Sequence, residues 1–206
     1  MDYSSSRTDL LADGIFAIVM TILVFEIKVP ELAYETNLIL YRELLNVYPL
    51  FLSYILSFAT LFTFWRGYHA VAADFAKSTD LKFQNIAGVF LLFVALVPFT
   101  SHLLGLYSTL SGAVTVFAFN VMLIGLLLLR LKVYATKTKA IRNKRMKSDE
   151  IKRGYIRILF PIVFAFIAIF VAHASTQVAL TMLTLAILFN MHKRSSHIIQ
   201  KLFNIY

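Results

Sequence analysis

The sequence contains no cysteine, and charged residues make up only 15% of its 206 positions. Without cysteine the chain forms no disulfide, no thiolate nucleophile and no cysteine-based metal site. A soluble domain carries about 25% charged residues, so the low share of charge excludes an ordinary water-soluble domain. The sequence also lacks the His-Glu-x-x-His, Gly-x-Ser-x-Gly and phosphate-binding loop patterns. We therefore expect no enzyme activity, no cofactor and no resident metal ion.

Long apolar stretches take the place of the missing charge, and 59% of the residues are hydrophobic. About 20 residues carry a helix across the hydrocarbon of a bilayer, and four stretches have that length: residues 10–29, 47–65, 86–104 and 110–129. A fifth apolar region is too long for one crossing, and the polar run 173–177 divides it into 156–172 and 177–191. The pattern predicts an all-α membrane protein with six transmembrane helices in one domain, residues 1–206.

Lys and Arg fall almost entirely on one side of these six spans. With the N-terminus inside, 18 of the 20 Lys and Arg lie on the inner side, a distribution typical of cytoplasmic loops. We therefore expect both termini in the cytoplasm and a multi-pass position in the cell membrane. The net charge of +9 then reflects topology and contact with anionic lipid, not nucleic-acid binding. We expect the basic cytoplasmic loop 130–155 to face lipid headgroups.

The first span carries an acidic residue, Asp13, close to its cytoplasmic end. An ionisable side chain within a span requires a partner or a wet cavity. At about 100° per residue, one stripe along this helix contains Gly14, Ile18, Thr21, Ile22, Phe25 and Val29. Asp13 lies about 140° from Ile18, so it packs against another helix if the stripe lines a pore. The expected partner is a cation, either Arg7, Arg66 or His69; the spacing alone favours ordinary helix packing for the stripe.

Two short motifs resemble a known family. Arg7, Asp13 and Gly14 match the Arg-x-x-x-Phe-Ser-Asp-Gly signature of the endosomal/lysosomal potassium and proton channel family, in which Leu11 and Ala12 here replace Phe and Ser. Trp65 and His69 are similar to the Trp-x-x-x-His element at the end of that family's second helix. The chain is most similar in length and helix count to the prokaryotic members, which have six helices and a plasma-membrane location.

The resemblance implies a homotetramer with one central pore lined by four copies of the first helix. It places apolar constriction layers at Ile18 and Phe25, with the Thr21 hydroxyl between them contributing to potassium selectivity and Ile22 on the same stripe. It assigns Arg7, Asp13 and His69, together with Gly14 and Trp65, to a structural network between helices. This family lacks the Thr-Val-Gly-Tyr-Gly filter, and so does this sequence.

Three hypotheses follow. The first is a potassium-permeable cation channel whose partners are potassium ions, the lipid bilayer and further copies of the chain. The second is a small proton-coupled secondary transporter that uses Asp13 and His69 as a proton relay. The third is a non-conducting membrane scaffold with a docking site in the basic segment 137–147. The first span contains no interior proline, which disfavours the broken helix of a carrier.

Overall fold

The computed structural model describes residues 5–72, 80–138, 141 and 148–191. Within these residues the chain forms eight α-helices and a 3₁₀ helix, with no β-strand, which confirms the all-α prediction. The elements are α1 (Ser5–Ile22), η1 (Leu23–Glu26), α2 (Asn37–Asn46), α3 (Tyr48–Ala70), α4 (Leu81–Ala95), α5 (Val97–Leu106), α6 (Ser111–Lys137), α7 (Ser148–Ala174) and α8 (Thr176–Met191).

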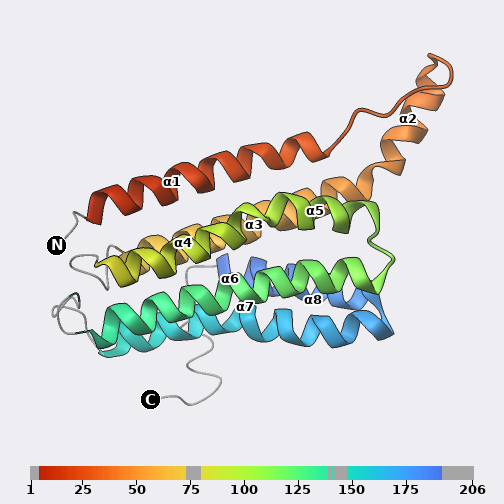
Figure 1. Ribbon diagram of the computed structural model, residues 1–206. Coiled ribbons are helices and arrows are strands. Elements are labelled where there is room, and N and C mark those ends of the chain that lie inside the picture. The colour runs from red at the N-terminus through yellow and green to blue at the C-terminus, as the bar shows by residue number, and fades with distance from the viewer. Residues whose placement is uncertain (1–4, 73–79, 139–140, 142–147, 192–206) are drawn as a thin grey trace.

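Six apolar helical stretches run side by side, and α8 returns toward the end of the bundle where α1 begins (Figure 1). Five of them are long and apolar enough to cross a membrane: Arg7–Glu26, Tyr48–Ala70, Leu81–Leu106, Ser111–Lys137 and Ile151–Ala174. The sixth, Thr176–Met191, is apolar but has only 16 residues. A membrane crossing by this sixth helix, and the cytoplasmic position of both termini, remain predictions.

The predicted basic loop 130–155 is too long, because much of it is helical. Residues 130–137 belong to α6 and residues 148–155 to α7. Lys132 is completely buried where these two helical extensions pack together, and its Nζ donates to the Ile151 carbonyl at 2.9 Å. The same ammonium lies 4.5 Å from the ring centroid of Tyr155, a cation–π arrangement that partly replaces the lost water. Residues 139–140 and 142–147 of the predicted segment lie outside the described residues.

The third apolar stretch crosses the bundle as two helices rather than one. Helix α4 ends at Ala95 and α5 begins at Val97, so the break falls at Leu96. Pro98 occupies the first turn of α5, where its missing N–H costs nothing but its ring prevents α4 from continuing. The break bends this stretch beside the middle of α1, and the uninterrupted apolar pattern of 86–104 gave no sign of it beyond that proline.

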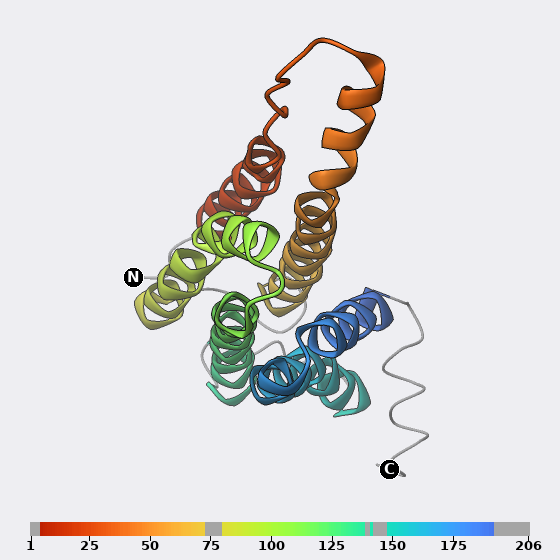
Figure 2. The same ribbon diagram turned by 90° about the vertical axis from the view of Figure 1, so that its right-hand side faces the viewer.

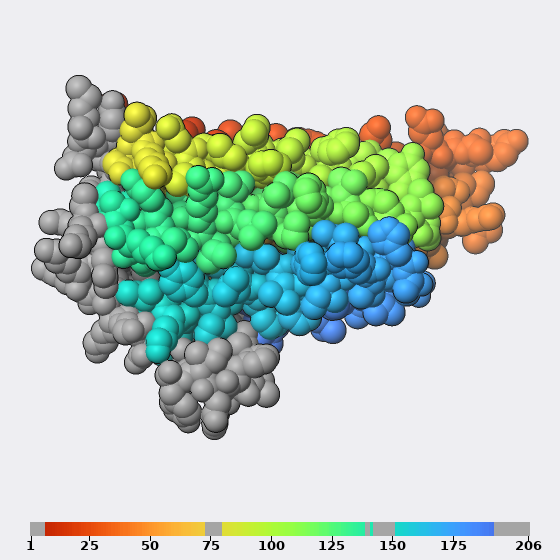
Figure 3. All heavy atoms as spheres, turned by 60° about the horizontal axis from the view of Figure 1, so that its bottom comes forward, coloured from red at the N-terminus to blue at the C-terminus, as the bar shows by residue number. Residues whose placement is uncertain are grey.

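Helix α2 was not predicted from the sequence. Its N-cap Thr36 accepts a hydrogen bond from the backbone N–H of Ile39 at 3.4 Å, and none of its residues is buried. The helix projects beyond the packed bundle at the end where α1 finishes (Figures 2 and 3). It therefore adds surface to the molecule without adding to the core.

Candidate pore-lining face of helix α1

Helix α1 lies at one side of the bundle, where it packs on α3, α4 and α5 (Figure 2). The packed face of α1, continued by the first residue of η1, consists of buried residues spaced four, three and four apart: Ala12, Phe16, Val19 and Leu23. This spacing is that of one helical stripe. The opposite face is open, because only 22% of the helix is buried, against 44–50% for the next three spans.

The predicted stripe coincides with this open face. Ile18 is 58% exposed, Ile22 39% and Phe25 76%, and Gly14 and Thr21 are exposed as well. The structure therefore rules out packing of these side chains inside the single chain, which was the interpretation that spacing alone favoured.

The Thr21 hydroxyl is the polar group at the centre of this face. It lies 2.9 Å from the Ala17 carbonyl and 2.8 Å from the Ile18 carbonyl, both of its own helix. Its single proton is thus held by the backbone, as is common for Thr within helices. The oxygen keeps its lone pairs on the exposed side and is an available ligand for a cation.

The outer end of the stripe departs from an ideal α-helix. After Ile22 the chain tightens into the 3₁₀ helix η1 and ends at Glu26, so residues at i and i+3 eclipse one another. Phe25 consequently lies directly above Ile22, nearer in rotation than a continued α-helix would place it. Val29, which the pattern included in the stripe, lies beyond the helix and does not belong to that face.

Asp13 is held by a neutral partner rather than the expected cation. The indole N–H of Trp65 donates to Asp13 Oδ1 at 2.8 Å, and the Trp65 ring stacks on His69 with centroids 5.9 Å apart. Arg66 donates instead to the Met191 carbonyl at 3.2 Å. A half-buried indole requires an acceptor, and Asp13 supplies it where α1 meets α3.

The structure thus brings together three members of the predicted network, Asp13, Trp65 and His69. The other two are not joined to them. Arg7 is exposed and makes no ion pair with Asp13, while a Cβ added to Gly14 would contact nothing within 4 Å.

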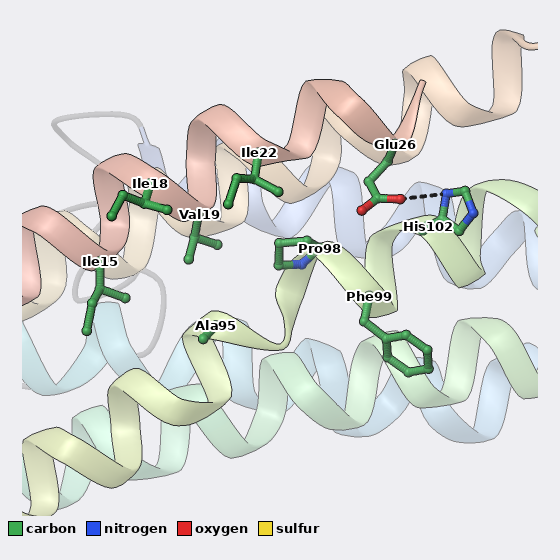
Figure 4. A pocket seen from close by; sticks show the side chains of 9 residues that line it. All are labelled: Ile15, Ile18, Val19, Ile22, Glu26, Ala95, Pro98, Phe99 and His102. Carbon is green, nitrogen blue, oxygen red and sulfur yellow. Dashed lines mark ion pairs between the residues drawn. The ribbon is translucent and has the colours of Figure 1, made fainter. Parts of the chain in front are cut away.

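A groove of about 560 Å³ separates α1 from the α4–α5 break (Figure 4). Its walls are Ile15, Ile18, Val19, Ile22, Ala95, Pro98 and Phe99, with Glu26 and His102 at one end. A carboxylate oxygen of Glu26 lies 2.9 Å from His102 Nδ1. This pair was not predicted from the sequence. The two residues stand 76 positions apart in the sequence, so only the packing of η1 on α5 reveals the contact.

The apolar helices and the open face of α1 define a multi-helix integral membrane protein. Residues 7–98 match the family described as the endosomal/lysosomal potassium channel TMEM175. The whole fold matches the crystal structure of a lysosomal potassium-selective channel TMEM175 homolog from Chamaesiphon minutus, with a TM-score of 0.80 and 26% identity over 93% of this chain and 97% of the other. Both comparisons thus show that the chain is similar to the TMEM175 family, in sequence over residues 7–98 and in fold over nearly its whole length.

Curated relatives are similar over a shorter part. A potassium channel of Chamaesiphon minutus is 36% identical over 103 residues, covering 50% of this chain and 50% of the relative. A potassium channel of Streptomyces collinus is 32% identical over 104 residues, covering 50% of this chain and 48% of the relative. The matched part of this chain thus spans about half the length of these relatives.

Proposed function

We propose that the chain is one subunit of a homotetrameric potassium-permeable channel whose pore is lined by four copies of α1. The observation that carries this proposal is the two-faced packing of α1, which buries one stripe completely and leaves Ile18, Thr21 and Phe25 open. Similarity to a family of potassium channels supports the assignment of this open face to the wall of an ion pore. In this arrangement six helices cross the cell membrane, and both termini lie in the cytoplasm.

The gate in this proposal is a ring of four Ile18 side chains. A narrow apolar ring loses its water, and a dewetted constriction raises the barrier for any ion. Phe25 and Ile22 form further apolar layers toward the other end of the span. Opening requires α1 to tilt or rotate until the ring widens enough to hold water.

Thr21 supplies the selective contact. Its proton is occupied by the carbonyls of α1, so four Thr21 oxygens would offer lone pairs to an ion passing the axis. Potassium sheds its water more readily than sodium, and it therefore gains more from this weak set of ligands. No Thr-Val-Gly-Tyr-Gly segment contributes, because the sequence contains none.

The alternative of a proton-coupled carrier is disfavoured by the Asp13 contact. A proton relay from Asp13 to His69 would need these two side chains in contact. Instead, Trp65 donates a hydrogen bond to Asp13 and stacks on His69, so it lies between them. Helix α1 is also continuous from Ser5 to Ile22, so it lacks the mid-membrane break on which carriers build their sites.

Ion flux in proteoliposomes tests the proposal. We expect passive flux under a potassium gradient that exceeds flux under an equal sodium gradient. Ile18→Asn should hydrate the ring and raise the potassium flux about tenfold, equivalent to about 1.4 kcal/mol of barrier. Ile18→Leu keeps an apolar ring of the same size and should leave the flux near that of the wild type.

Thr21 has its own matched pair of variants. Thr21→Ala removes the oxygen and should lower the preference for potassium over sodium, while Thr21→Ser keeps it and should retain that preference. Unchanged flux in Ile18→Asn together with unchanged selectivity in Thr21→Ala would refute the pore assignment. Uptake that requires a proton gradient would favour the carrier.

A further inference from the structure

The groove between α1 and the α4–α5 break has a strict gradient of polarity along its length. Its middle is formed by aliphatic and aromatic side chains such as Ile15, Ile22 and Phe99. Its only ionisable groups, Glu26 and His102, stand together at the end where α1 and η1 finish (Figure 4). A molecule lying in this groove along the bundle axis would therefore have a polar head at the membrane boundary and an apolar body within it.

The polar end of the groove can still accept a ligand. The side chains of Glu26 and His102 are 29% and 27% exposed, so both are half-buried but reachable. One Glu26 oxygen faces His102 Nδ1, and the structure records no bond to the other oxygen among the described residues. That second oxygen is an acceptor for a hydrogen-bond donor carrying positive charge. With Nδ1 facing Glu26, His102 has its second ring nitrogen, Nε2, left for a headgroup oxygen.

The groove has the size of an acyl chain rather than of a protein element. Its volume of about 560 Å³ lies within the range of pockets that hold small ligands. A helix of about 10–12 Å diameter fills this volume with roughly one turn, too short a contact to seat a helix of a second copy. The groove extends from the edge of the stripe, where Ile18 and Ile22 border it, across the flank of α1 that carries Ile15 and Val19.

We propose that this groove binds a membrane phospholipid with a primary ammonium headgroup, such as phosphatidylethanolamine. The ammonium donates to Glu26, the phosphate lies against His102, and one acyl chain lies along Val19, Phe99 and Ile15. The zwitterion of the headgroup thus meets a carboxylate and an imidazole in matching order. A choline headgroup carries the same charge but no N–H donor, so the site discriminates between the two lipids. This binding goes beyond ion conduction and can be measured without it.

The test compares lipids on the full-length protein. The purified chain, stripped of lipid in detergent, is titrated with dioleoyl phosphatidylethanolamine and with dioleoyl phosphatidylcholine, and bound lipid is counted by native mass spectrometry. We expect about tenfold tighter binding of the ethanolamine lipid, since its ammonium donates a charge-assisted hydrogen bond to Glu26 that choline cannot make. Glu26→Gln should reduce this preference to less than twofold. Glu31→Gln, an exposed carboxylate outside the groove, should keep it.

A second pair of variants tests the apolar wall independently of the charge. Ala95→Phe fills the middle of the groove and should weaken both lipids, whereas Val89→Phe adds volume at an exposed position of α4 outside the groove and should weaken neither. Equal affinity for the two lipids in the wild type, or unchanged binding in Ala95→Phe, overturns the proposal. Absence of saturable lipid binding also overturns it and indicates that another subunit covers the groove.

Discussion

The hydrogen bond from Trp65 to Asp13 makes a quantitative prediction about how α1 is held. Helix α1 has the smallest buried share of the five candidate spans, 22%, so single contacts carry more of its attachment than in the other helices. A hydrogen bond to a charged group contributes about 1.5–3 kcal/mol. Because both side chains are half-buried, we expect the lower part of that range, about 1.5 kcal/mol, when Asp13→Ala removes the acceptor.

The conservative variant should cost less. Asp13→Asn retains an oxygen that can accept from the same indole N–H at 2.8 Å, and loses only the charge assistance. We expect a loss of about 0.5–1 kcal/mol for Asp13→Asn. The same variant also separates the functional hypotheses, because a channel in which Asp13 only positions α1 keeps its potassium flux, whereas a proton relay through this carboxylate would stop.

A double-mutant cycle measures the bond itself. Trp65→Phe removes the donor, and the thermal stability of wild type, both single variants and Asp13→Ala/Trp65→Phe is followed by circular dichroism in one detergent. We expect a coupling energy of about 1 kcal/mol. Trp65 is the only tryptophan in the chain, so its fluorescence reports the loss of the carboxylate in the Asp13 variants directly. Additive losses in the cycle, with unchanged Trp65 emission in Asp13→Ala, would refute the assigned contact.

Two further predictions concern the packing of the bundle. A Cβ at Gly105 would lie 2.6 Å from two side chains of α3 and 3.1 Å from its backbone; Gly105→Ala should therefore lower the melting temperature through overpacking of about 1–3 kcal/mol. Gly88→Ala, where a Cβ meets nothing within 4 Å, should raise it slightly, and the opposite order would contradict the packing. Asp80 caps α4 and accepts from the Tyr134 hydroxyl, so Asp80→Ala should lose about 2 kcal/mol and Tyr134→Phe only about half of that. Equal melting temperatures of these two variants would show that the cap contributes nothing.

Much of the fold could be predicted because hydrophobicity is a local property of the chain. Each of the six apolar segments is helical, the third as the two helices α4 and α5, since a backbone in hydrocarbon must satisfy its hydrogen bonds within the segment. The stripe through Ile18 and Thr21 was equally local, because positions on one helix face follow from spacing alone. The offset of Asp13 from that stripe was also correct, as it packs against α3.

Contacts between helices could not be predicted in the same way. They depend on the depth and rotation of one helix against another, which no single segment encodes. The sequence therefore predicted a cation as the partner of Asp13, whereas the indole N–H of Trp65 donates to it in the structure. It likewise gave no sign that Glu26 and His102 are in contact. The extension of α6 to Lys137 was missed for the same reason. Lys132 is buried by its contact with α7, and the segment 130–137 alone does not reveal that contact.

Exposure of Ile18 within one chain does not by itself distinguish a pore from a lipid-facing surface, but Ile18→Asn does so through stability. On a lipid-facing helix the Asn amide would meet hydrocarbon, and an unpaired buried polar group costs about 1–3 kcal/mol, so the melting temperature would fall without any flux. In a pore the same amide would be hydrated, so flux would rise while stability changed little. Leu185, 62% exposed on α8, provides the comparison, since Leu185→Asn should lower stability and leave flux unchanged. If Ile18→Asn behaves like Leu185→Asn, α1 does not line the pore.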